Sequence, residues 1–218
     1  MDEEKRDEGY VPVILASLLQ PIADLFSQMD ARGPRGPNEV QASGVENGYA
    51  ASIIVLSIVV VESALNRTRY VRKEHEREHP IDTLSRLGAR DIADDAEELF
   101  VVRDAIAHNH LWDATFRWDD EVGMRLSSAR RLPGYGDKKF ERAVDPARRM
   151  TKRLGLDVFP TRVHRGTAVV VLKKCVEILQ FLESLDRRYV YLSQPWRVKV
   201  SSNLVPFYDW VKGLKESA

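Results

Sequence analysis

The sequence predicts a mainly α-helical protein, a bundle of four to five helices with a small basic α/β insertion between its third and fourth core helices. Three observations favour this fold. Four segments repeat apolar residues at helical spacing, one of them is apolar on all sides, and a stretch of different character separates the last two. With 218 residues, 44% of them hydrophobic and 30% charged, the chain can bury a real core, which excludes a mainly disordered protein.

The first helix is expected from Val11 to Met29. Residues 1–10 before it are polar and acidic and are expected to form a disordered tail. A kink is expected at Pro21, and the glycines and prolines of residues 33–37 break the chain after the helix. The apolar stripe consists of Ile14 or Leu15, Leu18, Ile22, Leu25 and Met29.

A second helix is expected from Ser43 to about Tyr70. Ser43 can cap it, and Glu46 follows at the spacing of a capping box. From Ile53 to Val61 the helix is apolar on all sides, which indicates a central, buried position. The most apolar run, residues 50–61, is shorter than the roughly 20 residues that span a bilayer, so no membrane partner is expected.

The third and fourth helices complete the predicted bundle. Pro80 ends the segment before it, and Asp82 is expected to cap a helix that reaches about His110. Its inward stripe is Ile92, Ala96, Leu99, Arg103, Ile106 and His110. The last core helix is expected from Thr167 to Leu185, with a stripe of Ala168, Leu172, Cys175, Leu179 and Leu182.

The chain therefore divides into a bundle of residues 11–112 and 164–186, an insertion of residues 113–163, and a C-terminal extension of residues 187–218 that packs on the bundle. In the insertion, residues 115–127 suggest a hairpin and residues 132–136 a loop. In the extension, residues 190–200 suggest a strand pair before a short helix with Phe207, Tyr208 and Trp210.

The compartment is predicted from what the chain lacks. A lone cysteine, Cys175, can form neither an internal disulfide nor a cysteine-based zinc site, and its place on an apolar stripe indicates a buried hydrophobe. The acidic start of the chain, MDEEKRDE, is unlike a signal peptide. We expect a soluble cytoplasmic protein.

The charges balance overall but not locally. The chain has 33 basic and 33 acidic residues, yet residues 125–153 hold ten basic and three acidic ones. Such a block is typical of a surface that binds phosphate, although it can also be a solvated insertion. Nine of its basic residues are candidates for binding RNA: Arg125, Arg130, Arg131, Lys138, Lys139, Arg148, Arg149, Lys152 and Arg153. Trp112, Trp118, Tyr135 and Phe140 lie among them, either to stack on bases or to form the core of the insertion.

Arg103 is unusual because it interrupts the apolar stripe of a core helix. A buried guanidinium needs a partner, and the candidate is Glu62, which stands alone in the most apolar helix. Asp104, His108 and His110 follow Arg103 within two turns. A permanent cation and two imidazoles close together can grip a phosphate and move protons.

The passage from Arg103 to His108 resembles the signature of the HEPN superfamily (higher eukaryotes and prokaryotes nucleotide-binding domains). That signature is an Arg, four to six residues of which the first is usually polar, and a His. Asp104 fills the polar place, His108 follows at a spacing of four, and His110 fits a spacing of six. The family is a bundle of four to five helices with its motif near the end of a late helix, and many members carry a Glu in the preceding apolar helix, as Glu62 does here.

The resemblance implies a metal-independent endoribonuclease of the toxin or phage-defence type, without a cofactor, whose two copies form one composite site in a homodimer. RNA is the implied substrate, and an antitoxin or regulatory protein is a further partner. His108 would take the proton of a 2′-hydroxyl and Arg103 would stabilise the phosphoryl oxygens. Asp104 and Glu62 would orient these two residues. The products would be a 2′,3′-cyclic phosphate and a 5′-hydroxyl.

Helix geometry leaves two choices for the working imidazole. Five positions on a regular helix amount to about 500°, so Arg103 and His108 diverge by roughly 140° unless the helix ends between them. Arg103 and His110, seven positions apart, share a face. Either the helix unwinds near Ala107 and His108 works, as the family pattern favours, or His110 does.

Two other functions remain open. In the first, the chain is a non-catalytic HEPN-like module that binds RNA or a protein and uses Arg103 and Glu62 structurally. In the second, a zinc hydrolase, His75, Glu76 and His79 form an H-E-x-x-H motif with Glu97 or Glu98 as third ligand. The charged surroundings of that motif, and Pro80 directly after it, favour a solvent-facing segment over a helix that lines a cleft.

Overall fold

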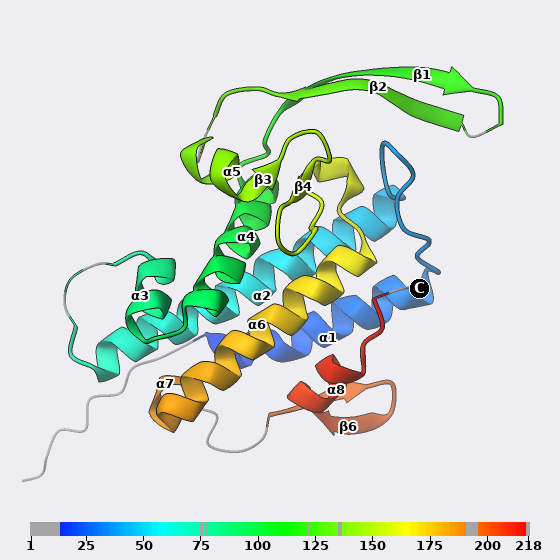
Figure 1. Ribbon diagram of the computed structural model, residues 1–218. Coiled ribbons are helices and arrows are strands. Elements are labelled where there is room, and N and C mark those ends of the chain that lie inside the picture. The colour runs from blue at the N-terminus through cyan, green and yellow to red at the C-terminus, as the bar shows by residue number, and fades with distance from the viewer. Residues whose placement is uncertain are drawn as a thin grey trace, which may run out of the picture.

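The computed structural model describes residues 14–74, 76, 78–121, 123–134, 137–190 and 196–216. The expected tail, His75 and Tyr135 lie outside these residues. The mainly α prediction is confirmed, since the described residues form eight α-helices and three small two-stranded antiparallel sheets. The four long helices are α1 (Leu15–Ala31), α2 (Gly44–Val71), α4 (Arg90–Ala107) and α6 (Arg165–Leu185). In Figure 1, α1, α2 and α6 run alongside one another and α4 crosses them.

Helix α2 is the centre of the core, as its apolar residues predict. It packs against α1, α4, α6 and the short α7 (Arg187–Val190), which bury one broad face of the helix with Ile53, Ile54 and Val61, while Val55 and Val59 on the other side are partly buried. By length and composition α2 could also cross a bilayer, with a mean hydropathy of 2.0 over its most apolar 18 residues, half of which are buried inside the protein.

At the start of α2, one of the two hydrogen bonds of the expected capping box is present. Ser43 Oγ accepts a hydrogen bond from the Glu46 backbone N–H at 3.2 Å, as predicted. The buried Glu46 carboxylate instead accepts hydrogen bonds from the backbone N–H groups of Arg35, Gly36 and Arg165, at 3.0–3.2 Å. It therefore joins the loop before α2 to the first turn of α6, where its negative charge is favourable.

The outer helices of the core differ in how closely they match the prediction. The stripe expected on α6 is buried at all five positions, and the helix begins two residues earlier than expected. The face of α1 is shifted, because Leu19 and Phe26 are buried where Leu18 and Leu25 were expected. Both sets have helical spacing, and the packing against α2 selects between them.

The expected third helix is wrong in its extent, because the structure has two helices there. Helix α3 (Pro80–Arg86) has His79 and not Asp82 as its N-cap, and Pro80 begins it. Proline suits the first turn of a helix, where its missing N–H is not needed. The chain then turns at Gly88, which has a φ of +91°, and α4 follows with Ala93, Ala96, Leu99 and Phe100 buried.

Helix α4 ends at Ala107, three residues before the expected end. Asn109 adopts a φ of +46°, and its N–H donates to the Ile106 carbonyl while that of His110 donates to the Ala105 carbonyl. These two bonds are a Schellman motif, in which asparagine is the best-tolerated residue after glycine in the left-handed position. His108 is thus the C-cap of α4, and His110 lies beyond the helix.

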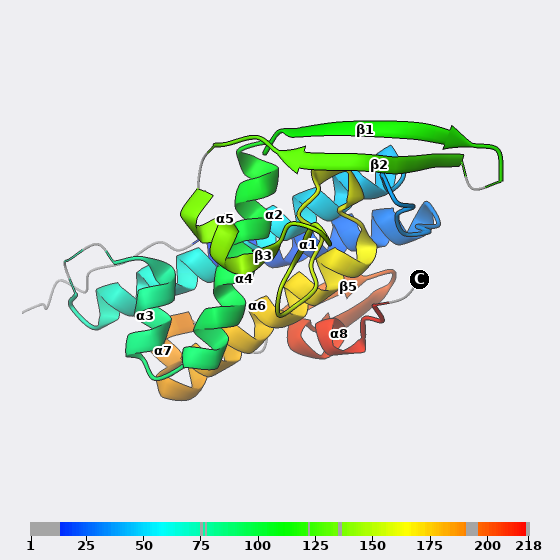
Figure 2. The same ribbon diagram turned by 45° about the horizontal axis from the view of Figure 1, so that its top comes forward.

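The connection between α4 and α6 contains the insertion. The expected hairpin is confirmed and longer than predicted, with β1 (Trp112–Asp119) paired to β2 (Gly123–Arg131) around an irregularity at Thr115/Phe116. After it come α5 (Asp137–Ala143), β3 (Val144–Asp145), β4 (Met150–Thr151) and a 3-10 turn, Pro160–Arg162. Figures 1 and 2 show the hairpin lying over the end of the bundle where α2 begins.

The C-terminal residues form a strand pair, β5 (Arg197–Val200) with β6 (Asn203–Pro206), and the expected short helix α8 (Phe207–Gly213). β5 lies against α1 and α8 against α6. The Trp210 ring meets the Phe26 ring edge-on with centroids 5.6 Å apart, which fixes α8 to the core.

The segment between α2 and α3 is held by Arg86. Its guanidinium contacts the Glu74 carboxylate at 2.7 and 2.8 Å and Glu78 at 2.8 Å. These contacts from Arg86, and a further one from Arg72, hold the pKa of Glu74 down to about 2, against the opposing effect of partial burial.

We predict that Glu74 contributes stability above pH 4.5, its ordinary pKa, and that this contribution disappears as the pH falls from there to about 2. Because both side chains are partly exposed, the effect amounts to about 1 kcal/mol. Arg86→Gln should flatten this part of the pH profile of unfolding, measured with urea. The exposed Arg90→Gln, which breaks no ion pair among the described residues, should keep it; equal profiles for the two variants would contradict the prediction.

We also predict that Asn109→Val lowers the free energy of unfolding by about 1–2 kcal/mol, because a β-branched residue resists a positive φ. Asn109→Gly should be neutral or slightly stabilising. Urea denaturation of the two variants measures this, and an equal loss in both would show that the backbone conformation is not the cause.

Candidate functional site

Arg103 and Glu62 pair across the interface of α4 and α2, which confirms the partner expected from the sequence. Arg103 Nη2 donates to Glu62 Oε1 at 3.0 Å, and Arg103 Nε lies 3.2 Å from Asp104 Oδ1. The guanidinium also lies 5.4 Å from the centre of the Phe100 ring. The Arg103 side chain keeps 25% of its surface exposed, so it is held in place while one side faces solvent.

Asp104 continues this pairing into the insertion. Its side chain is only 4% exposed, and its Oδ2 lies 2.5 Å from Lys139 Nζ on α5. Four residues from three helices thus alternate in charge, Glu62, Arg103, Asp104 and Lys139, and we call them the ionic chain. Its charges balance, as partly buried charges must. The sequence marked Lys139 for RNA, but its ammonium is committed to Asp104.

The two candidate imidazoles have different surroundings. His108, the C-cap of α4, is exposed one turn beyond Arg103. His110 is buried, its Nδ1 accepts a hydrogen bond from Arg131 Nε at 3.3 Å, and its ring meets Phe140 edge-on. A neutral His110 therefore carries its proton on Nε2. Of the two alternatives, the helix does end near Ala107, which leaves His108 the accessible imidazole.

His110 belongs to a cluster at the base of the hairpin. The Arg131 guanidinium stacks on the Phe140 ring at 4.3 Å and contacts Asp137 Oδ1 at 2.5 Å. That contact, with a hydrogen bond from the Gly134 N–H, lowers the pKa of Asp137 below its ordinary value. The cluster joins the end of α4 to β2 and α5, so His110 and Arg131 hold the insertion in place.

Several other basic residues of the block also have partners within the chain. Arg125 lies near Asp119 and Glu39, at 3.4 and 3.6 Å, and Arg153 contacts Asp95 at 3.1 Å. Lys152 donates to two backbone carbonyls at the end of α5. Within the described residues, three exposed members of the block make neither an ion pair nor a side-chain hydrogen bond: Arg130, Lys138 and Arg148. Arg149 is partly buried, and its Nε has no hydrogen-bond partner there.

An acidic face of α4 that sequence reasoning missed supplies some of these partners. Glu97 contacts Arg142, and the buried Glu98 accepts the backbone N–H groups of Arg153 and Leu154 at 2.8 Å. The signal was present in the acidic residues at positions 91, 94, 95, 97 and 98, which face the insertion only because the chain returns across α4.

The described residues give the zinc motif no support. Glu76 and His79 lie outside any helix, so the helical face that the motif requires is missing, and His75 is outside the described residues. His79 Nδ1 accepts the Ile81 N–H at 3.4 Å, and Glu97 and Glu98 have the partners just given. Among the described residues no cluster of three or more metal-binding side chains occurs.

The aromatic residues of the insertion divide between core and surface. Trp112 packs edge-on against Phe140 and Phe159, with ring centres 6.2 and 5.2 Å away, and forms the insertion's small core. Trp118 on the hairpin is 73% exposed. Cys175 is buried as expected, and this burial raises the pKa of its thiol.

We predict that Lys139→Met lowers the free energy of unfolding by about 3 kcal/mol, because it leaves a buried Asp104 carboxylate without its closest cation. The double variant Asp104→Asn/Lys139→Met should recover part of that loss. The exposed neighbour makes a matched control, and Lys138→Met should stay within about 0.5 kcal/mol of the wild type. Equal effects of the two lysine variants in chemical denaturation would contradict the ionic chain.

No family model, no curated protein and no solved structure matches this chain. Its function is therefore inferred from the residues of the site and from the motif that they form.

Proposed function

We propose that this protein is a metal-independent endoribonuclease of the HEPN type, a cytoplasmic toxin or phage-defence effector that acts as a homodimer. One observation carries the proposal. Arg103 is held by Glu62 and Asp104 but stays partly exposed, and α4 ends so that the accessible His108 follows it within two turns.

The arrangement of the helices supports the same proposal. Four long helices form the core, the most apolar one carries Glu62, and the motif lies at the end of a later helix. This is the arrangement expected of a HEPN bundle. The insertion then follows directly after the motif, and the base of its hairpin lies at the end of α4 (Figure 1).

The residues suit cleavage by the neighbouring 2′-hydroxyl. A neutral His108 would accept the proton of that hydroxyl while its oxygen attacks the phosphorus. Arg103 would stabilise the charge on the phosphoryl oxygens, since among the described residues its Nη1 has no hydrogen-bond partner and can be offered to a phosphate. The departing 5′-oxygen would take a proton from the second copy of the motif, leaving a cyclic phosphate and a 5′-hydroxyl.

RNA would lie across the insertion. Arg130, Lys138 and Arg148 are exposed cations that can contact phosphates, and Phe116 and Trp118 are exposed rings on one face of the hairpin that can stack on bases. These five residues, which lie on more than one face of the insertion, replace the longer basic list as the contacts that we propose for RNA.

A second function, a non-catalytic module that binds RNA or a protein, is favoured by the ionic chain itself. Glu62 and Lys139 hold Arg103 and Asp104 in a way that also suits a purely structural role. The two functions differ in His108, which only the enzyme needs.

We predict that the purified protein cleaves RNA in EDTA and leaves 2′,3′-cyclic phosphate ends. His108→Ala should reduce the cleavage rate by a factor of about 100 or more, the range of a lost general base, with little change in thermal unfolding because His108 is exposed. His79→Asn is the matched control, since it removes an exposed histidine elsewhere and keeps a side chain that can cap α3.

Full activity of His108→Ala, or activity that EDTA abolishes, would refute the enzyme. RNA binding without cleavage by the wild type, unchanged in His108→Ala, would establish the non-catalytic module.

A further inference from the structure

A pocket of about 740 Å³ lies at the C-terminal end of α2, against α7. Figure 1 shows this end of α2 beside α3 and α7, whereas the end of α4 with Arg103 lies beneath the start of the hairpin. The volume is within the range of roughly 300–1,000 Å³ that small-molecule sites occupy. The proposed ribonuclease site does not use this pocket.

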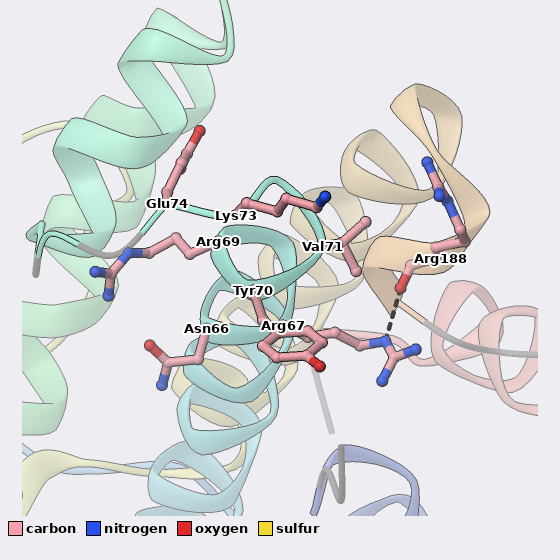
Figure 3. Close-up of a pocket in the computed structure, with 8 residues that line it drawn as sticks. All are labelled: Asn66, Arg67, Arg69, Tyr70, Val71, Lys73, Glu74 and Arg188. Carbon is pink, nitrogen blue, oxygen red and sulfur yellow. Dashed lines mark hydrogen bonds between the residues drawn. The ribbon is translucent and has the colours of Figure 1, made fainter. Parts of the chain in front are cut away.

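We propose that the pocket binds an organic phosphate of nucleotide size, with its phosphates on the cationic side chains and its ring on Tyr70. Four lining residues are cationic, Arg67, Arg69, Lys73 and Arg188, against a single carboxylate, Glu74. In Figure 3 the charged ends of Arg67, Lys73 and Arg188 lie on the same side of the helix end, whereas the Arg69 guanidinium points to the opposite side.

The positive charge of the pocket is only partly balanced by its neighbours. Glu74 is engaged by Arg86 and Arg72, both outside the lining, and Arg188 is paired with Asp186 at 2.6 Å. Among the described residues, neither Arg69 nor Lys73 has a carboxylate within ion-pair distance. Arg69 Nε is also buried without a hydrogen-bond partner there, although a terminal nitrogen donates to the Glu76 carbonyl. Such a cluster of like charges is relieved by a bound anion.

The backbone places two of these cations. Arg67 Nε donates to the Arg188 carbonyl at 2.7 Å, which ties the end of α2 to α7 and fixes the Arg67 guanidinium at the edge of the pocket (Figure 3). Lys73 has a φ of +59° in a second Schellman motif, where glycine would cost less. A lysine kept in this conformation brings an ammonium to the pocket that glycine would not.

The dipole of α2 opposes the binding of an anion at this end of the helix. The negative end of a helix disfavours an anion by about 0.3–1 kcal/mol at an exposed site. The Arg69 and Tyr70 carbonyls, however, already accept the backbone N–H groups of Glu74 and Lys73, at 2.9 and 3.0 Å. Several side-chain cations outweigh this remaining dipole.

The remaining lining accounts for the organic part of the ligand. The Tyr70 side chain is 56% exposed at the pocket, and Val71 is an apolar neighbour. An exposed aromatic ring is a stacking surface for a planar base, and nearby cations take the phosphates. A nucleotide with two or more phosphates offers a planar base to Tyr70 and phosphates to the cations. An inorganic polyphosphate offers phosphates without a base.

Calorimetric titration of the full chain with ATP, and separately with pyrophosphate, tests the proposal. We expect one ATP per chain. Lys73→Gly should weaken ATP binding by about tenfold or more while keeping or raising the thermal unfolding temperature, because glycine relieves the positive φ. Tyr70→Ala should weaken ATP but not pyrophosphate. Lys212→Ala, an exposed lysine on α8, should change neither.

Three results would overturn the proposal: no heat from ATP at about 1 mM, ATP binding that Lys73→Gly leaves unchanged, or binding of single-stranded RNA that Lys73→Gly weakens without any binding of free ATP. The titration does not depend on RNA cleavage, so this proposal and the ribonuclease can each fail alone.

Discussion

The structure depends on the burial of α2, a helix that is apolar on all sides. Such a helix is stable in water only when much of its apolar surface is covered, and here α1, α4, α6 and α7 bury half of its most apolar 18 residues. A carboxylate on this helix needs a cation as a partner, and Glu62 pairs with Arg103 on α4. Arg103 in turn lies beside Asp104, which binds Lys139 of the insertion. The core packing therefore determines where the candidate site lies and how the insertion is attached.

The end of α4 shows how local backbone chemistry selects between two side chains. The left-handed conformation at Asn109 ends the helix and separates His108 from His110 by a sharp turn. His108 is left exposed, while His110 turns inward against Phe140 and Arg131. The choice of the working imidazole in the proposed enzyme is thus a consequence of helix termination.

Charge that looks free in the sequence is largely committed in the fold. The basic block suggested a broad phosphate-binding surface, yet Arg125, Arg131, Lys139, Lys152 and Arg153 all have partners inside the chain. The described residues of the insertion's basic block that remain exposed and without an ion pair or side-chain hydrogen bond are fewer, namely three cations, and two exposed rings lie on the hairpin. At the other end of the bundle Arg67, Arg69 and Lys73, which are close in the sequence, are joined at one pocket by the distant Arg188.

The sequence by itself determined the long helices, the hairpin, the buried stripe of α6 and the Glu62–Arg103 pair, because these follow from periodicity and from the cost of an unpaired buried charge. Only the tertiary structure decided the face of α1, the separation of α3 from α4, and the partners of the basic block. It alone brought Arg188 to the end of α2. These features depend on contacts between residues far apart in the chain, and a local pattern holds no information about which distant residue will supply the contact.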